Sequence, residues 1–215
     1  MRDRLPDVRY RGRDASRFKA ARWLAPFLLS VVLAGCASHS RGTGGSLRPG
    51  AAGQLPVTLS DVRRAQAVVR KVASHTPLVE ERALSGLCGA RVYLKLENLQ
   101  YTGSFKVRGA YNKIANLPEA QRAKGVVTAS AGNHAQGVAL AAGAFGIPAT
   151  IVMPETVPES KLAATRAYGA NVVLHGRTFD EALARAHEIQ RGTGATFVHP
   201  FDDRMTVAGQ GTVGL

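Results

Sequence analysis

The chain has 215 residues, of which 45% are hydrophobic, enough for one globular domain of ordinary size with room for a second small one. Its only cysteines, Cys36 and Cys88, lie in very different surroundings, and its histidines are scattered, so we expect neither a disulfide framework nor a metal site. The formal net charge of +13 is densest in the first fifty residues and forms no basic stripe interleaved with aromatic residues, which argues against a nucleic-acid-binding protein.

Residues 1–54 are interpreted as a signal-like leader followed by a flexible linker. An Arg-rich segment precedes an uncharged apolar run at residues 23–33, which is short for a membrane span, since a spanning helix needs roughly 20 apolar residues. Residues 33–36, Leu-Ala-Gly-Cys, are similar to a bacterial lipobox, in which the cysteine (here Cys36) is lipidated. Residues 37–54 are rich in Gly, Ser, Arg and Pro, as expected of a linker.

Beyond residue 90, short apolar segments alternate with helical ones. Strands are expected at residues 92–96, 125–129, 149–153, 171–174 and 196–198. Helices are expected at residues 106–117, 134–145, 158–168 and 178–191. Ser104 is a candidate cap for the first of these helices, and Gly146 follows the second. This alternation predicts an α/β fold in which a parallel sheet forms the middle of three layers.

Lys106 lies where a loop enters the first of these helices, in the sequence Gly-Ser-Phe-Lys-Val-Arg-Gly of residues 103–109. The positive end of the helix dipole favours a neutral amine there, and a Schiff-base lysine needs a neutral amine. Most lysines at helix starts are solvated surface groups, so the position of Lys106 does not by itself identify a cofactor site.

A loop of small residues, Ser-Ala-Gly-Asn-His at positions 130–134, connects an expected strand to the next helix. Open α/β sheets bind ligands beyond the carboxyl ends of their strands, and backbone N–H groups at a helix start can hold an anion. A plain strand-to-helix turn has the same composition, and for this segment alone it is the better explanation.

The two segments together carry a specific resemblance. Residues 94–112, LKLENLQYTGSFKVRGAYN, and residues 130–137, SAGNHAQG, resemble the threonine (serine/threonine) dehydratases of the fold-type II pyridoxal-phosphate enzymes. The resemblance runs from about residue 55 to residue 215 without large gaps. It implies the N-terminal half of the three-layer parallel sheet that tryptophan synthase β also has, with a small subdomain at roughly residues 125–205.

The resemblance implies pyridoxal 5'-phosphate as the cofactor and assigns the site residues. Lys106 would hold the cofactor covalently and act as the base at the substrate Cα. Phe105 would lie beside the cofactor ring, and Asn133 would bond to the 3-hydroxyl of the ring. The substrate carboxylate would be held by four loop residues, Ser130, Ala131, Gly132 and His134.

The activity that the resemblance implies is conversion of threonine or serine to 2-oxobutanoate or pyruvate and ammonia, a step of amino-acid metabolism that includes isoleucine biosynthesis. The full-length form is expected to be a homo-oligomer. Position 107 is Val, where cysteine and threonine synthases usually have Asp. Serine racemases place a serine, a second acid/base, at the position of Ala131, which cannot move a proton, so dehydration is favoured over racemisation.

Two motifs of the family are not found in this sequence: the glycine run that cups the cofactor phosphate, and the Ser or Cys partner of the pyridine nitrogen. We therefore expect the chain to be a fragment of a longer product, inactive and marginally stable alone, with apolar surface and strand edges exposed. The alternative is a catalytically dead or lipid-anchored remnant of the fold.

The leader also has two explanations. Either Cys36 anchors an exported lipoprotein, or an upstream start codon adds a meaningless extension to a cytoplasmic enzyme. We favour the cytoplasmic location, because the implied chemistry needs a cofactor that is supplied there.

Overall fold

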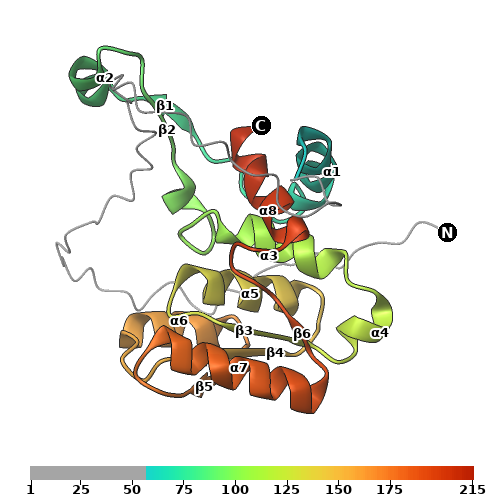
Figure 1. Cartoon of the computed structure of the whole chain (residues 1–215). Helices are drawn as coiled ribbons and strands as arrows, with labels where there is room; N and C mark the ends of the chain where they lie inside the picture. The colour runs from blue at the N-terminus through green and yellow to red at the C-terminus, as the bar shows by residue number, and fades with distance from the viewer. Residues whose placement is uncertain (1–56) are drawn as a thin grey trace, which may run out of the picture. The chain divides into compact units, whose positions relative to one another are not determined.

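The computed structural model describes residues 57–215, which belong to one compact unit, Leu55–Leu215 (Figure 1). The expected leader and linker, including Cys36, lie outside the described residues. Among the helices of residues 57–215, none combines the length and the hydropathy that a membrane span requires.

A four-stranded parallel sheet, in the order β5-β4-β3-β6, lies at the centre of this unit. Its strands are β3 (Val126–Ala129), β4 (Ala149–Met153), β5 (Asn171–Leu174) and β6 (Thr196–Phe197). Each lies within an expected strand, and the prediction of a parallel sheet is confirmed.

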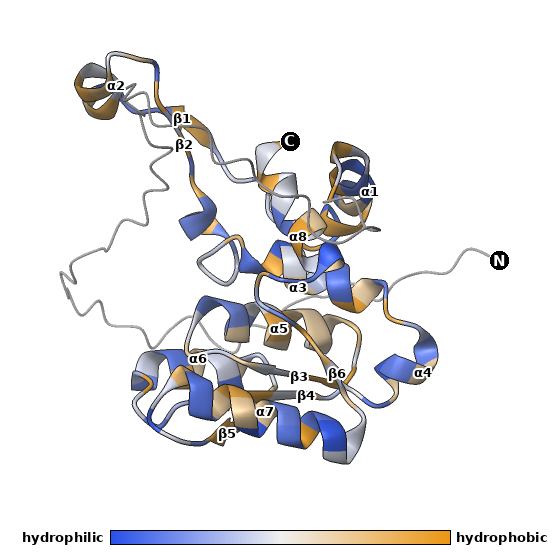
Figure 2. Ribbon diagram, viewed as in Figure 1, coloured by the Kyte–Doolittle hydropathy of each residue, from blue (hydrophilic) through white to orange (hydrophobic). Residues whose placement is uncertain are grey.

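Helices cover both faces of the sheet, because its strands are apolar on both sides. Side chains of successive strand residues point to opposite faces. Ile151 therefore packs in the cluster beneath α5 (Asn133–Ala144) and α6 (Glu159–Ala167), whereas Val152 packs against α7 (Phe179–Thr193). Hydrophilic and hydrophobic turns alternate along α7 in Figure 2, as expected of a helix with one buried face. The prediction of three layers is confirmed.

Helix ends follow the sequence signals in most places. α7 begins with a capping box, in which the Thr178 hydroxyl accepts from the Glu181 N–H group and the Glu181 carboxylate accepts from that of Thr178. The expectation that Ser104 caps α3 (Lys106–Ala115) is wrong: the capping position is Phe105, which makes no side-chain cap bond. The Ser104 hydroxyl lies 3.4 Å from the Lys106 nitrogen, at the limit of a hydrogen bond.

A further group of helices, α1 (Leu59–Val69), α3 and α8 (Arg204–Gly211), lies beyond α5 (Figure 1). Glycine allows α3 and α8 to approach closely. A Cβ atom at Gly209 would lie 2.5 Å from the Arg108 carbonyl oxygen and 2.8 Å from the Gly109 Cα. Backbone atoms cannot move aside as a flexible side chain can, so this contact sets the distance between the two helices.

The segment before α3 forms an arm that stands apart from the helices in Figure 1. In it, β1 (Leu78–Glu80) pairs antiparallel with the expected strand β2 (Tyr93–Lys95), and α2 (Arg82–Cys88) connects them. Neither β1 nor α2 is predicted from the sequence. Several large apolar residues of the arm are exposed, namely Leu78, Val79, Leu87 and Tyr93. Three short helices complete the unit: η2 (Glu97–Leu99), α4 (Glu119–Arg122) and η3 (Thr212–Gly214).

A buried ion pair between Glu97 and Arg108 connects the base of the arm to α3. The Arg108 guanidinium makes two hydrogen bonds of 2.8 Å to the Glu97 carboxylate, which also accepts one of 2.6 Å from Thr76. Glu97 and Arg108 are both buried. Burial acts to raise the pKa of Glu97, but the hydrogen bonds from Arg108 and Thr76 outweigh it and hold the pKa below its ordinary 4.5.

Removing one partner of this pair should destabilise the unit strongly. Arg108→Met leaves the Glu97 carboxylate buried and unpaired, and we expect the free energy of unfolding in urea to fall by about 3 kcal/mol. Arg185→Met, in the exposed Arg185–Glu188 pair, should lower the free energy of unfolding by less than about 1 kcal/mol. Equal losses of unfolding free energy in Arg108→Met and Arg185→Met would contradict the claim that burial makes the Glu97–Arg108 pair the more important one.

The stabilisation by the Glu97–Arg108 pair should depend on pH. Because the folded-state pKa of Glu97 is lowered, this stabilisation is present above pH 4.5 and is lost as the pH falls through the folded pKa.

The glycine contact between α3 and α8 predicts opposite effects at two helical glycines. Gly209→Ala forces the two backbones apart and should lower the free energy of unfolding by about 1–3 kcal/mol. Gly192 of α7 has no atom within 4 Å of its Cβ position, so Gly192→Ala should raise this free energy by about 0.5 kcal/mol through helix propensity. Urea unfolding of the two variants tests the contact, and a stabilising Gly209→Ala would refute it.

Candidate active site

Lys106 is the first residue of α3, and its side chain is half-buried. Its amine donates a hydrogen bond of 2.9 Å to the Pro200 carbonyl oxygen. Burial lowers the pKa of Lys106 below its ordinary 10.5. The sequence argument for a neutral amine rested on the helix dipole; in the structure, burial of the amine supplies the effect.

Phe105 precedes the helix, and its ring lies beside the amine of Lys106. The Lys106 Nζ atom is 5.3 Å from the centre of the Phe105 ring. Phe105 is 36% exposed, so part of this residue is open to a ligand. The two adjacent residues thus present an amine and an aromatic face side by side.

The loop of residues 130–134 follows the carboxyl end of β3, where parallel α/β sheets bind their ligands. The Ser130 N–H group donates to the Val152 carbonyl, and the Ser130 hydroxyl accepts from the Gly132 N–H group at 3.2 Å. Asn133 begins α5 and is exposed. The loop therefore places small residues and backbone N–H groups at the start of a helix, as an anion site requires.

Gly137 brings this loop and Lys106 together. A Cβ atom at Gly137 would lie 3.1 Å from the Lys106 carbonyl carbon and 3.1 Å from the Val107 nitrogen. Gly137 stands four residues after Asn133, about one helical turn along α5. The two segments that resemble the dehydratases are thus in contact through their backbones.

His134 is almost fully buried, with 3% of its surface exposed, and its Nε2 atom lies 2.9 Å from the Val198 carbonyl oxygen. A carbonyl can only accept, so Nε2 carries the hydrogen and Nδ1 is a free acceptor, which has no hydrogen-bond partner among residues 57–215. Burial lowers the pKa of His134 to about 4, and the charge of Lys106 adds to that effect. The side chain is therefore neutral at pH 7 and offers a substrate carboxylate no positive charge.

Three further residues near the site were not identified as site residues from the sequence. The Pro200 carbonyl accepts a hydrogen bond from the Lys106 amine, and the Gln210 side chain donates a hydrogen bond to the same carbonyl. Lys161 of α6 lies beside the loop, since a Cβ atom at Gly132 would be 3.2 Å from the Lys161 Nζ. No local pattern marks these residues, because each reaches the site from a distant part of the chain.

The arrangement fits the aldehyde end of a pyridoxal-phosphate cofactor. A half-buried amine with a lowered pKa suits a lysine that bonds to a carbonyl carbon, and the adjacent Phe105 ring suits an aromatic cofactor. The unpartnered Nδ1 of His134 is a polar atom still able to accept a hydrogen bond. Within residues 57–215, no group of three or more His, Cys, Asp or Glu side chains could hold a metal ion.

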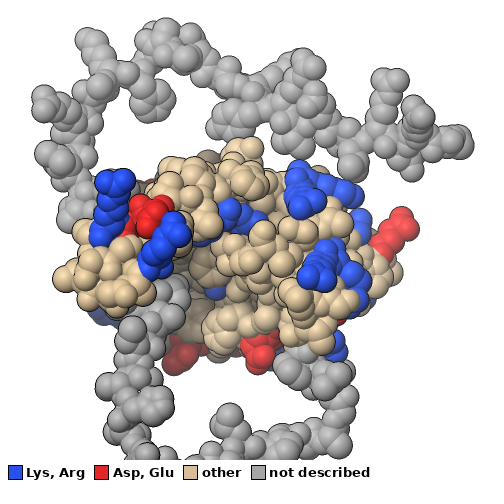
Figure 3. Space-filling view, turned by 90° about the horizontal axis from the view of Figure 1, so that it is seen from above, with Lys and Arg blue, Asp and Glu red and all other residues tan. Residues whose placement is uncertain are grey.

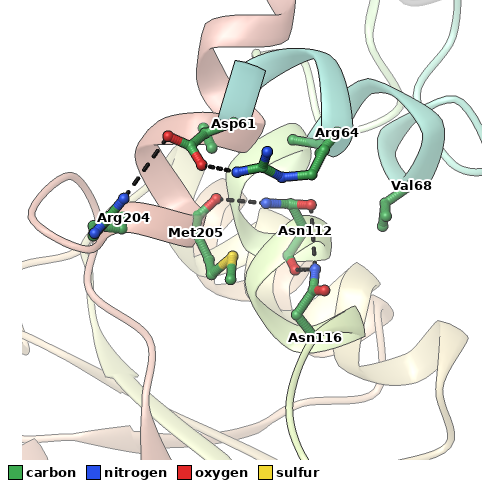
Figure 4. A pocket seen from close by; sticks show the side chains of 9 residues that line it. Asp61, Arg64, Val68, Asn112, Asn116, Arg204 and Met205 are labelled. Carbon is green, nitrogen blue, oxygen red and sulfur yellow. Dashed lines mark hydrogen bonds and ion pairs between the residues drawn. The ribbon is translucent and has the colours of Figure 1, made fainter. Parts of the chain in front are cut away.

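A separate cavity of about 350 Å³ lies between α1, α3 and α8 (Figure 4). Arg64 and Arg204 both pair there with Asp61. Nine residues line it, namely Asp61, Arg64, Ala65, Val68, Asn112, Asn116, Arg204, Met205 and Ala208. None of them is a predicted site residue. On the face shown in Figure 3, the basic side chains lie in separate groups rather than in one continuous stripe.

Comparison with known proteins agrees with this geometry. The family model described as "Pyridoxal-phosphate dependent enzyme" matches residues 69–215. The chain is 59% identical over 159 residues to the L-threonine ammonia-lyase of Thermotoga maritima, which covers 74% of the chain and 40% of that relative.

Two solved structures are similar in both sequence and fold. Threonine deaminase isoform 2 of Solanum lycopersicum is 44% identical, with a TM-score of 0.66, over 74% of this chain and 45% of that one. Maize serine racemase is 37% identical, with a TM-score of 0.70, over 74% of this chain and 48% of that one.

The chain thus spans less than half the length of each of these relatives. The family match nevertheless covers most of the chain and includes Lys106 and the whole loop of residues 130–134. The chain belongs to the family of pyridoxal-phosphate-dependent enzymes.

Proposed function

We propose that residues 57–215 supply the reactive lysine and the substrate loop of a threonine ammonia-lyase that uses pyridoxal 5'-phosphate. The backbone contact of Gly137 with Lys106 carries this proposal, because it sets the amine beside the loop that suits a carboxylate. The identity of 59% with an L-threonine ammonia-lyase favours threonine as the substrate, with serine as the second choice. Residues 125–205 would be the small subdomain of this enzyme.

The side chains have distinct roles in this proposal. Pyridoxal phosphate, when bound, withdraws electrons from the substrate Cα and so makes its proton acidic. Lys106 would hold the cofactor through its amine and later take the Cα proton, and the burial that lowers the pKa of that amine favours the neutral form that both roles need. Phe105 lines the cofactor ring, and Asn133, exposed at the start of α5, bonds to its 3-hydroxyl.

The loop binds the carboxylate of the amino acid through backbone N–H groups rather than through a cationic side chain. Ser130, Ala131, Gly132 and His134 form this loop in the proposal. His134 contributes through its backbone, because its imidazole is neutral and already donates to Val198. Loss of the Cα proton and the β-hydroxyl removes one water from threonine and leaves an enamine, and hydrolysis of this enamine by water yields 2-oxobutanoate and ammonia.

Serine racemisation is the second candidate, since the maize serine racemase has a similar structure. Racemisation needs a second acid/base on the opposite side of the Cα atom from the lysine. Ala131 offers only a methyl group at the position where a serine would serve. We therefore favour dehydration. The proposal also includes a cytoplasmic location and a homo-oligomeric full-length form.

A chimera tests the proposed function directly. Residues 57–215 would replace the matching segment of the Thermotoga maritima enzyme, to which they are 59% identical. The chimera should convert threonine to 2-oxobutanoate in the presence of pyridoxal phosphate. Lys106→Ala should lower this rate by roughly 10³-fold or more, because the reactive amine is lost.

Lys124→Ala is the matched control, since Lys124 is an exposed lysine outside the site, and it should leave the rate unchanged. A folded chimera that binds the cofactor but does not dehydrate threonine would refute the proposal. Formation of D-serine from L-serine without pyruvate would favour the racemase instead.

A further inference from the structure

The Pro200 carbonyl oxygen accepts two hydrogen bonds at once. One comes from the Lys106 amine at 2.9 Å, and the other comes from the Gln210 side-chain amide at 3.0 Å. A carbonyl oxygen has two lone pairs, so both are occupied. Gln210 and Lys106 therefore share one acceptor oxygen.

The position of this carbonyl does not depend on Gln210 alone. The His199 Nδ1 atom accepts from the N–H groups of Phe201 at 3.3 Å and Asp202 at 2.8 Å, which closes a turn around Pro200. Asp203 then caps α8 and pairs with Lys113 on α3 at 2.6 Å. The turn would keep the carbonyl beside Lys106 if the amide of Gln210 were removed.

Gln210 is itself held against the helix that carries the lysine. A Cβ atom at Gly109 would lie 2.7 Å from the Gln210 Cγ, so this side chain packs directly over Gly109. Gly109 is three residues after Lys106 and shares its face of α3. The Gln210 amide is thus fixed where it meets the Pro200 carbonyl.

We propose that Gln210 is a positioning residue for Lys106, which occupies one lone pair of the Pro200 carbonyl and so weakens the hold of that carbonyl on the ammonium form. Each donor draws electron density from the oxygen, so a carbonyl that accepts from two donors offers each a weaker bond. An ammonium gains more from such a bond than a neutral amine does, because hydrogen bonds from charged donors are the stronger ones. Gln210 thereby favours the free amine that bonds to the cofactor and takes a proton. This inference rests on the role proposed for Lys106.

The charged groups around Lys106 do not mask an effect of Gln210 on its pKa. The titratable groups that the other elements bring to the site are His134 on α5, His199 in the turn and Lys161 on α6, and His134 is neutral at pH 7. Asp203, the acid of the same turn, is already paired with Lys113. No carboxylate in the described part of the chain forms an ion pair with Lys106.

Competitive labelling of the full chain without cofactor tests the inference. Trace acetic anhydride would be applied over a range of pH, and acetylation of Lys106 would be measured by mass spectrometry against the exposed Lys71. Gln210→Met removes the donor at nearly constant volume and should raise the pKa of Lys106, slowing its labelling near neutral pH about threefold. Gln210→Glu adds a carboxylate near the amine and should slow it about tenfold.

Gln121→Met and Gln121→Glu, at an exposed glutamine of α4, are the matched controls and should change nothing. Circular dichroism would establish that each variant is folded, and the isosteric Gln210→Glu variant keeps the test valid if Gln210→Met is unstable. An unchanged pKa of Lys106 in the folded variants would overturn the inference. A lowered pKa in Gln210→Met would also overturn it, because Gln210 would then hold the carbonyl toward the ammonium. Neither result depends on turnover, so failure here is distinct from failure of the proposed function.

Discussion

The contact between Gly137 and Lys106 is the constraint on which the rest of the site depends. A methyl group at Gly137 would lie 3.1 Å from the Lys106 carbonyl carbon, so α5 and α3 meet there almost backbone to backbone. Because α5 begins at the loop after β3, this contact fixes the loop relative to the lysine. A side chain at Gly137 would press on the backbone of Lys106 and Val107 and so alter the spacing between α5 and α3, and with it the distance from the lysine to the loop of residues 130–134. The glycine is thus a site residue although it carries no reactive group.

The segment after β6 contacts the same site. Its Val198 carbonyl accepts from His134 and its Pro200 carbonyl accepts from Lys106, so one short stretch of backbone orients the buried imidazole and the half-buried amine. Gly209 allows α8 to lie close to α3 and so brings Gln210 to that stretch. Packing through glycines and hydrogen bonding to carbonyls together position the lysine.

Local sequence patterns predict much of the fold but only part of the candidate site. The strands of the sheet are short, mostly apolar runs, and the sequence places all four of them. In the arm, β2 is expected but β1 is missed, because β1 is exposed along its length and has no alternating pattern. Lys106 and the loop at residues 130–134 are recognised by resemblance, whereas Pro200 and Lys161 reach the site through long-range contacts that leave no mark in the sequence. The cause of the lowered pKa of Lys106, its burial, likewise becomes visible only in the structure.

The most direct test of the central claim is to identify the lysine that bonds to pyridoxal phosphate. The purified chain would be mixed with the cofactor and reduced with borohydride, which traps even a weakly held bond, and its peptides would be mapped by mass spectrometry. Our account predicts that the phosphopyridoxyl group is on Lys106, with little on Lys161 although that amine lies beside the same loop. A label on Lys161, or one spread evenly over the exposed lysines, would contradict the claim that Lys106 and this loop form one cofactor site.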